Sequence, residues 1–514
     1  MNDDLLLGID AGTSVIKVAL FNRAGACVTS AARATTVRTP RPEWSEANPG
    51  EFWQLTAEAI REVLAQTDGS AVKAIGITGN MVGAWLIDAG GSPVRDAILW
   101  NDGRSQSIID QLTVTTPDLM ERVFASTGAV MQQGCTLPVV RWLAEHEPET
   151  LKRAAHVLCC KDWLRFKLTG EIYADQTEAS VMPGDIRARG YSEAMFDLLG
   201  VREYRALFPP PAASEAVCGG ITEAAARETG LSIGTPVVAG AGDVPASALG
   251  AGAVEPWVAC VILGTTCLSC LTTDEPMFTP PNVGLNFPLP SDRWLRVMAN
   301  IAGTTNLDWF VSQFYAAERA ALASADLFAL LEREAESSPV GANGVLYHPY
   351  LSPVGVIAPF VEVGARAQFF GLLPSHTRAD LLRAVYEGVA LAIRDCYAAM
   401  GVPLAEVRLS GGGAKSRLWG QIIADCLGAR VFVPAGGEFG AKGAALLAGT
   451  GIGWYASPRA AAQATDAIAR RYTPDPARTA AYDHMYARYR AVREALQAVW
   501  RDFPHPSPPV PSAT

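Results

Sequence analysis

The chain has 514 residues, of which 49% are apolar and 18% are charged, and its formal net charge is -10. This apolar content excludes intrinsic disorder, collagen and coiled coil, and the length favours two or more domains, because single cores seldom exceed roughly 250–300 residues. The acidic balance argues against nucleic acid as a partner, since neutralising a phosphate backbone requires a basic surface.

The chain opens with a predicted β-hairpin. Apolar runs at 5–9 and 15–21 flank the small-residue turn DAGTS at 10–14, and a further turn leads to a third strand near Cys27. Helical periodicity follows at 49–64.

Asp10 ends the first strand of this hairpin and precedes Gly12, Thr13 and Ser14. Backbone N–H groups and hydroxyls of such a turn can bind phosphate oxygens, while the carboxylate can hold a hydrated Mg²⁺. Lys17 in the next strand could add a positive charge. By itself the pattern favours an ordinary hairpin turn.

A second carboxylate stands out in AGAGDVPA, residues 239–246, after a predicted strand at 235–239. Small and apolar neighbours would partly desolvate Asp243. It is either a turn residue or a general base that projects into a cleft.

A second hairpin is predicted about 250 residues after the first. Its strands at 258–263 and 267–271 flank the turn GTT, in which Gly264 and Thr265 could contact a phosphate. Alone, this motif is a turn. Its match with the first hairpin supports the phosphate-binding interpretation. The match also suggests two related halves that face each other across a cleft.

A long helix is predicted to begin at Thr377, with Asp380 completing a capping box, and to end near Gly401. The sequence LSGGGAKSRLW at 409–419 then predicts a strand, three glycines and a helix. Glycines at that position let a ligand such as a nucleoside approach the backbone closely. The motif is neither a Walker A loop nor a GxGxxG fingerprint.

The alternation of helices and strands predicts an α/β fold. We expect an N-terminal domain at 1–250, a C-terminal domain at 251–503 that ends in a helix over 474–503, and a proline-rich tail at 504–514.

The ten cysteines are scattered and mostly lie in apolar runs, as expected of reduced thiols in a cytoplasmic protein. Cys267 and Cys270 have CxxC spacing, which alternation along a strand explains. The start of the chain has no signal-peptide pattern, and the apolar stretch 237–271 contains acidic residues, so we expect no membrane span.

In their order and spacing, these four motifs resemble the FGGY family of carbohydrate kinases. The segments 365–388 and 161–171 strengthen the resemblance, which extends from Leu5 to about Tyr489, although Cys160 stands where the family often has proline. The resemblance implies two actin-like, ribonuclease H-like domains with an interdomain cleft, and ATP and Mg²⁺ as cofactors.

The resemblance also implies roles for individual residues. Asp10 and Asp243 would organise Mg²⁺, and Asp243 would also be the catalytic base and contact the substrate. The nucleotide would be bound by Thr13, Ser14, Lys17, Gly264, Thr265, Gly412, Gly413 and Ser416. The sugar would be bound by Asn80, Met81, Val82, Trp100, Asn101, Asp102 and Arg104.

Within the family, the sequence is most similar to xylulokinases, so the expected substrate is a ketopentose such as D-xylulose. Xylulokinases usually read Gln-Met-His-Gly where this chain reads Asn80-Met81-Val82-Gly83. The missing His leaves a tetritol or other polyol, such as erythritol, as an alternative. The glycerol kinase pattern fits less well, because Met81 and Val82 replace its Arg-Glu pair and Val244 replaces a Gln.

Two further alternatives remain at this point. Met81 and Val82 could simply be core residues. The chain could also be a non-catalytic actin-like ATPase, which would need neither Asp243 nor a sugar wall. No membrane partner is expected, and homodimer formation is left open.

Overall fold

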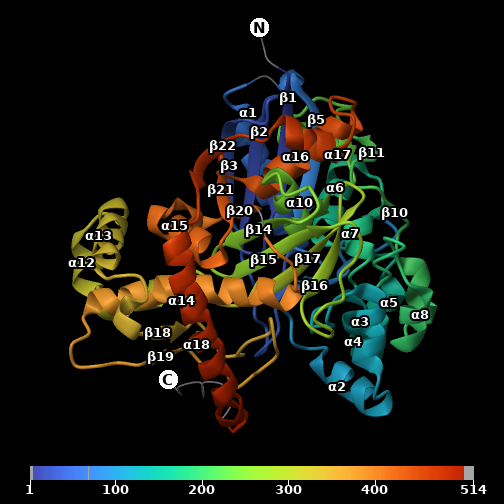
Figure 1. Cartoon of the computed structure of the whole chain (residues 1–514). Helices are drawn as coiled ribbons and strands as arrows, with labels where there is room; N and C mark the ends of the chain where they lie inside the picture. Colours follow the sequence, from blue (N-terminus) through green and yellow to red (C-terminus); the bar gives the residue numbers. More distant parts are fainter. Residues whose placement is uncertain (1–3, 68, 405, 503–514) are drawn as a thin grey trace.

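The computed structural model describes residues 4–67, 69–404 and 406–502. Two mixed β-sheets, each packed against helices, form the molecule (Figure 1). The first sheet has the strand order β11-β12-β5-β1-β2-β3, with β13 also paired to β5. Its strands are β1 Leu5–Ala11, β2 Val15–Phe21, β3 Cys27–Ala34, β5 Val72–Gly79, β11 Val217–Gly220, β12 Pro236–Val238 and β13 Ala241–Gly242.

The second sheet has the order β16-β17-β15-β14-β20-β21-β22. Its strands are β14 Val258–Leu263, β15 Cys267–Thr273, β16 Leu285–Leu289, β17 Arg293–Asn300, β20 Glu406–Ser410, β21 Arg430–Pro434 and β22 Ile468–Tyr472. Short pairs form away from both sheets: β4 Glu46–Ala47 with β7 Ala97–Ile98, β6 Trp85–Ile87 with β8 His156–Leu158, β9 Ala174–Asp175 with β10 Pro211–Ala212, and β18 Leu346–His348 with β19 Gln368–Phe370.

The two sheets repeat one pattern. β1 and β2 are antiparallel while β5 runs parallel to β1, and likewise β14 and β15 are antiparallel while β20 runs parallel to β14. Both predicted hairpins are therefore confirmed, as is the α/β class. The Cys267–Cys270 pair lies buried on β15, and all ten cysteines are free thiols.

The helices of the N-terminal part are α1 Pro49–Leu64, α2 Gln106–Thr115, α3 Leu119–Thr127, α4 Thr136–His146, α5 Pro148–Arg153, α6 Cys160–Thr169, α7 Gln176–Ala179, α8 Glu193–Leu198, α9 Glu223–Thr229 and α10 Asp243–Gly250. Those of the C-terminal part are α11 Thr305–Phe314, α12 Ala316–Ala321, α13 Ser324–Ser337, α14 Arg378–Met400, α15 Arg417–Leu427, α16 Phe439–Gly451, α17 Pro458–Ala464 and α18 Pro476–Arg501.

Local sequence signals set the helix ends. The Asn48 side chain accepts the N–H of Glu51 at the start of α1, and the predicted capping box of Thr377 and Asp380 begins α14, which ends at Gly401 with a φ of +73°. The predicted last helix is α18. The expected proline-rich tail lies outside the described residues.

Helix α16 packs on β1 and β5 of the first sheet, although it follows the second sheet in the chain, and it lies beside α10 (Figure 1). A Cβ on Gly8 would lie 1.9 Å from the carbonyl oxygen of Ala441, and one on Gly76 would lie 1.8 Å from that of Ala444. Glycine is therefore required at both strand positions, and the helix backbone rests directly on the sheet.

In the parts of the chain that the structure describes, no helix is long and apolar enough to cross a bilayer.

Candidate active site

Asp10 and Asp243 are brought together by strand β5. β1 and β13 both pair with β5 near its end, where Asp10 lies opposite Thr78 and Gly242 lies opposite Gly79. The Thr78 hydroxyl donates to the carbonyl of Ala241 at 2.7 Å, and this bond holds β13 against β5. Asp243 is the next residue, and it begins helix α10.

Both carboxyls are partly accessible but poorly hydrated. Desolvation, and secondly the charge of Asp10, raise the pKa of Asp243 to about 7. Desolvation raises the pKa of Asp10 to about 6, against the lowering effect of Lys17. A carboxylate with such a pKa can accept a proton near neutral pH, and two neighbouring carboxylates attract a cation.

The start of α16 packs against the Asp10 carboxyl. A Cβ on Gly440 would lie 2.3 Å from Oδ2 of Asp10, so only glycine leaves room for that carboxylate. Glu438, with a φ of +48°, precedes the helix and pairs with Nζ of Lys17 at 2.9 Å. Lys17, expected at the nucleotide, is thus already paired with a carboxylate. Sequence reasoning missed Glu438 and Gly440.

The first predicted phosphate loop is the β1–β2 turn. Ser14 is exposed, and the Thr13 hydroxyl accepts a hydrogen bond from the Trp100 indole N–H at 2.9 Å. This contact joins the loop to the predicted sugar wall.

The second predicted phosphate loop is the β14–β15 turn, where Thr265 is exposed. The N–H of Gly303 donates to the carbonyl of Thr265 at 2.7 Å, and that of Thr304 donates to Gly264 at 2.8 Å. The segment 300–304 therefore fixes the loop, which sequence reasoning did not foresee.

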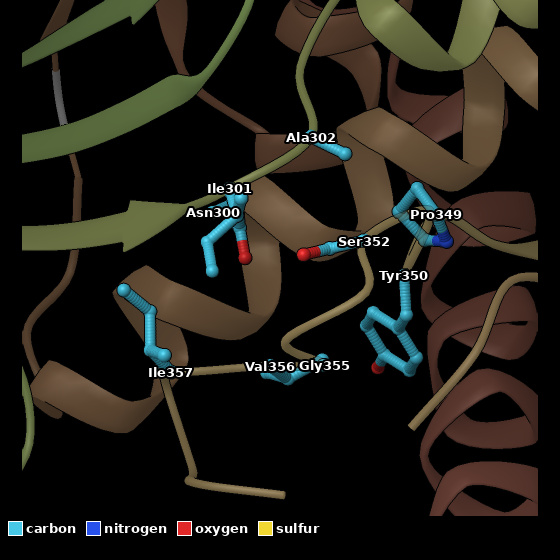
Figure 2. Close-up of a pocket in the computed structure, with 9 residues that line it drawn as sticks. All are labelled: Asn300, Ile301, Ala302, Pro349, Tyr350, Ser352, Gly355, Val356 and Ile357. Carbon is cyan, nitrogen blue, oxygen red and sulfur yellow. The ribbon is translucent and has the colours of Figure 1, made fainter. Parts of the chain in front are cut away.

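Beside this segment lies a cavity of about 10 Å³, lined by residues 300–302, 349–350, 352 and 355–357 (Figure 2). It has room for about one water molecule and so is too small for a sugar or a nucleotide.

The glycine-rich loop lies next to the second phosphate loop because β20 and β14 are parallel neighbours. Gly412 is exposed, and nothing lies within 4 Å of a Cβ built on it, whereas a Cβ on Gly413 would collide with Leu263. Ser416 caps α15 by accepting the Trp419 N–H at 3.1 Å. Of the three predicted adenosine residues, Gly412 is the most open to a ligand.

The predicted sugar wall begins directly after β5. The Asn80 side chain donates to the carbonyl of Ala11 at 3.1 Å. Met81 packs closely on the backbone of Gly242, because a Cβ built on that glycine would lie 2.2 Å from the Met81 sulfur. Val82 is half-buried, with a φ of +55°. Met81 thus contacts the residue that precedes Asp243.

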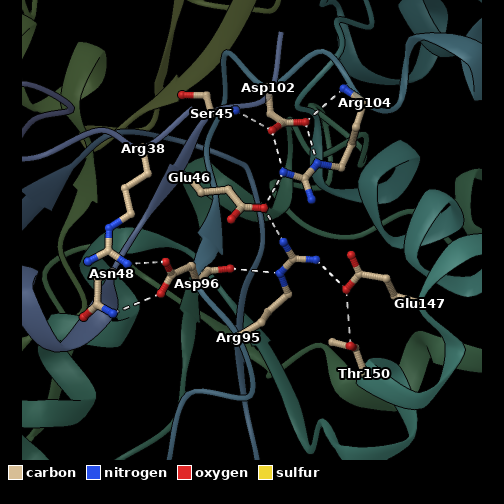
Figure 3. Close-up of polar contacts among 10 residues, drawn as sticks. All are labelled: Arg38, Ser45, Glu46, Asn48, Arg95, Asp96, Asp102, Arg104, Glu147 and Thr150. Atoms are coloured by element: carbon tan, nitrogen blue, oxygen red, sulfur yellow. Dashed lines mark hydrogen bonds and ion pairs between the residues drawn. The ribbon is translucent and has the colours of Figure 1, made fainter. Parts of the chain in front are cut away.

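The second part of the predicted wall divides into two. Trp100 is 44% exposed and Asn101 is exposed, whereas Asp102 and Arg104 are buried in an ion-pair network with Glu46 (Figure 3). Nε of Arg104 donates to Asp102 at 2.7 Å, and its Nη2 donates to Glu46 at 2.6 Å. These contacts bury both side chains within the network and hold the loop that presents Trp100, although Nη1 of Arg104 has no hydrogen-bond partner among the residues that the structure describes.

No cluster of three or more His, Cys, Asp or Glu residues suited to a metal ion occurs within residues 4–67, 69–404 and 406–502. The donor chemistry nevertheless fits Mg²⁺, since Asp10 and Asp243 offer carboxylate oxygens and lie close enough for the charge of Asp10 to raise the pKa of Asp243. Phosphate oxygens and water would supply the remaining ligands.

Comparison with known proteins identifies the family of the chain. The model of the FGGY family of carbohydrate kinases, N-terminal domain, matches residues 5–250, and that of the C-terminal domain matches residues 259–452. The chain is 34% identical to "Erythritol kinase" from Brucella abortus over 97% of each chain. It is 35% identical to "Xylulose kinase" from Escherichia coli over 86% of this chain and 89% of that one.

Solved structures show the same fold. The xylulose kinase from Rhodospirillum rubrum has a TM-score of 0.85 and 28% identity, covering 97% of this chain and all of that one (100%). A "xyloylose kinase" from Brucella ovis has a TM-score of 0.84 and 30% identity, with 96% and 100% of the two chains covered.

Proposed function

The chain belongs to the FGGY family of carbohydrate kinases, and on that premise we propose that it transfers the γ-phosphoryl group of ATP to a hydroxyl of a ketopentose such as D-xylulose. The observation that carries this proposal is that strand β5 brings Asp10 near Asp243, close enough for the charge of Asp10 to raise the pKa of Asp243. A carboxylate base can activate water as well as a sugar hydroxyl, so the sugar acceptor is inferred from the xylulose kinase and erythritol kinase relatives.

Asp243 acts as the general base in the proposed reaction. The sugar hydroxyl oxygen attacks the γ-phosphorus and its proton passes to the Asp243 carboxylate, while the bond from the γ-phosphorus to the bridging oxygen breaks and ADP leaves. The pKa of Asp243, raised to about 7, suits a base that works near neutral pH.

The remaining site residues position the reactants. Thr13 and Ser14 would bind phosphate from one side, and Gly264 and Thr265 from the other, with Gly412 beside the nucleoside. Asp10 would hold Mg²⁺, which when bound neutralises phosphate charge. Positioning and charge neutralisation supply most of the rate in phosphoryl transfer.

The substrate assignment rests on the wall residues. Trp100 and Asn101 are exposed at its edge, whereas Met81 is buried in a hydrophobic cluster and Val82 packs partly against the same cluster, as the core alternative expects. A ketopentose is the first candidate because xylulose kinases dominate the relatives. A tetritol such as erythritol is the second, because Val82 offers no polar side chain to a hydroxyl and the Brucella erythritol kinase matches along the whole chain.

We also propose that the chain divides near residue 250 into the two domains expected from the sequence, and that it works in the cytoplasm. The ten free thiols, nine of them buried, support a reducing location.

The test is coupled ADP release over a panel of D-xylulose, D-ribulose, erythritol, erythrulose and glycerol. Sugar-dependent turnover is expected, with the highest kcat/KM for a ketopentose. Asp243→Asn should lower kcat by ~10²–10⁴ while ATP binding is nearly kept. ATP turnover that no panel member alters would contradict the kinase proposal, and a mutant with near-normal kcat would remove Asp243 as the base.

A further inference from the structure

Val82, on the sugar wall, has an unusual backbone conformation. Its φ of +55° lies in the left-handed region, which is disfavoured for a β-branched residue. Gly83, the next residue, has a φ of +73°. Such a turn persists only if its surroundings hold it.

One side chain holds the Val82 amide. Oε2 of Glu178, on the short helix α7, accepts the Val82 N–H at 3.0 Å. Glu178 is fully buried. A buried carboxyl is costly unless its oxygens find hydrogen-bond donors, and the Val82 amide is the donor for Oε2.

The same four-residue helix also holds the strand end before the catalytic base. The Thr177 hydroxyl accepts the N–H of Gly242 at 2.8 Å and donates to Asp175 at 2.5 Å. Adjacent side chains of α7 therefore contact the Val82 turn on one side and the residue before Asp243 on the other.

Glu178 is not needed there for its charge. Behind it lie two cations, Lys161 and Arg165, and two anions, Asp162 and Asp175, all buried and paired with each other. These four charges balance without Glu178, and burial raises the pKa of Glu178 to about 8. The hydrogen bond to the Val82 amide therefore depends on the length of the Glu178 side chain and needs only an acceptor oxygen at its end.

We propose that Glu178 is a positioning residue, which sets the distance between the sugar wall at 80–83 and the base Asp243 by holding the Val82 amide. The inference rests on the proposed function, since it deepens the description of that same sugar site. It assigns to α7 a role in sugar recognition, although Glu178 acts through the wall.

Variants at Glu178 separate position from charge. Glu178→Gln keeps an acceptor of the same reach, whereas Glu178→Asp keeps the carboxyl but shortens the side chain by one methylene. For the panel sugar with the highest kcat/KM, Glu178→Gln should stay within ~2-fold of wild type, while Glu178→Asp and Glu178→Ala should raise the sugar KM by ~10-fold or more. The KM for ATP should change by less than ~2-fold in all three.

Asp162→Asn is the matched control. It alters a carboxyl of the same buried cluster that accepts hydrogen bonds from Lys161 and Arg165, so it should lower the thermal midpoint without changing the sugar KM. If Glu178→Ala acted only through a general loss of packing, Glu178→Ala and Asp162→Asn would change the sugar KM alike.

Combining the Glu178 change with Val82→Gly tests whether Glu178 acts by holding the strained Val82 backbone. Glycine adopts a φ of +55° without strain, so Val82→Gly should shrink the effect of Glu178→Ala on the sugar KM to less than ~3-fold. The proposal is overturned if Glu178→Gln is as damaging as Glu178→Ala, if Glu178→Asp is harmless, or if the effect is equally large in both backgrounds.

Amide hydrogen exchange gives a readout that needs no substrate. Glu178→Ala should speed exchange in a peptide spanning 80–85, and Glu178→Gln should not. Unchanged exchange would overturn the inference even if sugar phosphorylation is observed. If no panel member is phosphorylated but exchange responds as expected, the proposed function fails while the positioning contact stands.

Discussion

Gly440 gives the strictest test of how the active site is built. Helix α16 begins so close to Asp10 that a methyl group on residue 440 would lie 2.3 Å from Oδ2 and 2.8 Å from Cγ of that carboxyl. An ordinary contact needs at least 3.4 Å, so Gly440→Ala must move either the carboxyl or the helix by about 1 Å.

The helix has little freedom to move. The carbonyl oxygens of Ala441 and Ala444 already touch the sheet at Gly8 and Gly76, and a Cβ on Gly443 would lie 1.9 Å from the carbonyl oxygen of Ala246. The Asp10 carboxyl must therefore take up the shift. A misplacement of ~1 Å at a catalytic site costs ~10²-fold in rate, so kcat should fall by about that factor while the sugar KM changes little.

The assay is steady-state ADP release with both substrates varied. Gly437→Ala is the matched control, because it adds the same methyl group three residues earlier, where nothing lies within 4 Å. It should behave like wild type. If Gly440→Ala keeps kcat within ~3-fold of wild type while the protein stays folded, the position of the Asp10 carboxyl does not govern the reaction.

Two further predictions concern other parts of the molecule. Burial lowers the pKa of His348 from 6.5 to about 4. The folded state therefore favours the neutral imidazole, which contributes ~3 kcal/mol to stability above pH 6.5. This contribution is lost as the pH falls toward 4. Denaturant unfolding at pH 7 and pH 4.5 should show a smaller loss for His348→Gln than for wild type, and equal losses would refute the assignment. Trp100→Phe removes the hydrogen bond to Thr13 and should lower kcat/KM for the sugar by ~2–10-fold, whereas Trp257→Phe, at another exposed tryptophan, should not. Equal effects of the two changes would deny Trp100 a place at the site.

Local signals made much of this fold predictable. The strand–turn–strand pattern around Asp10 and the capping box at Thr377 depend only on residues close together in the sequence, and both are present in the structure. The pairing of Asp10 with Asp243 follows from the sheet, because strand β5 lies between the strands that carry them. Sequence could indicate each carboxylate separately but could not measure their separation.

Contacts between distant segments were beyond local reasoning. Glu438 and Gly440 follow Asp10 by more than 400 residues in the chain, and the apolar, glycine-rich sequence of α16 marks a buried helix without naming the sheet it covers. Glu178 was missed for a similar reason, because its partner is a backbone amide 96 residues away. Asp102 and Arg104 were instead predicted to bind the sugar. Their charges are opposite and only two residues apart, so they form an ion pair with each other.

Phosphorus NMR of a mixture of the protein, ATP, Mg²⁺ and D-xylulose tests the central claim most directly, because it identifies where the γ-phosphoryl group goes. The account predicts that a sugar phosphate monoester appears in the same amount as ADP, and that neither forms at a comparable rate with Asp243→Asn. Formation of ADP with inorganic phosphate in place of the monoester, for D-xylulose and for every other member of the sugar panel, would contradict it.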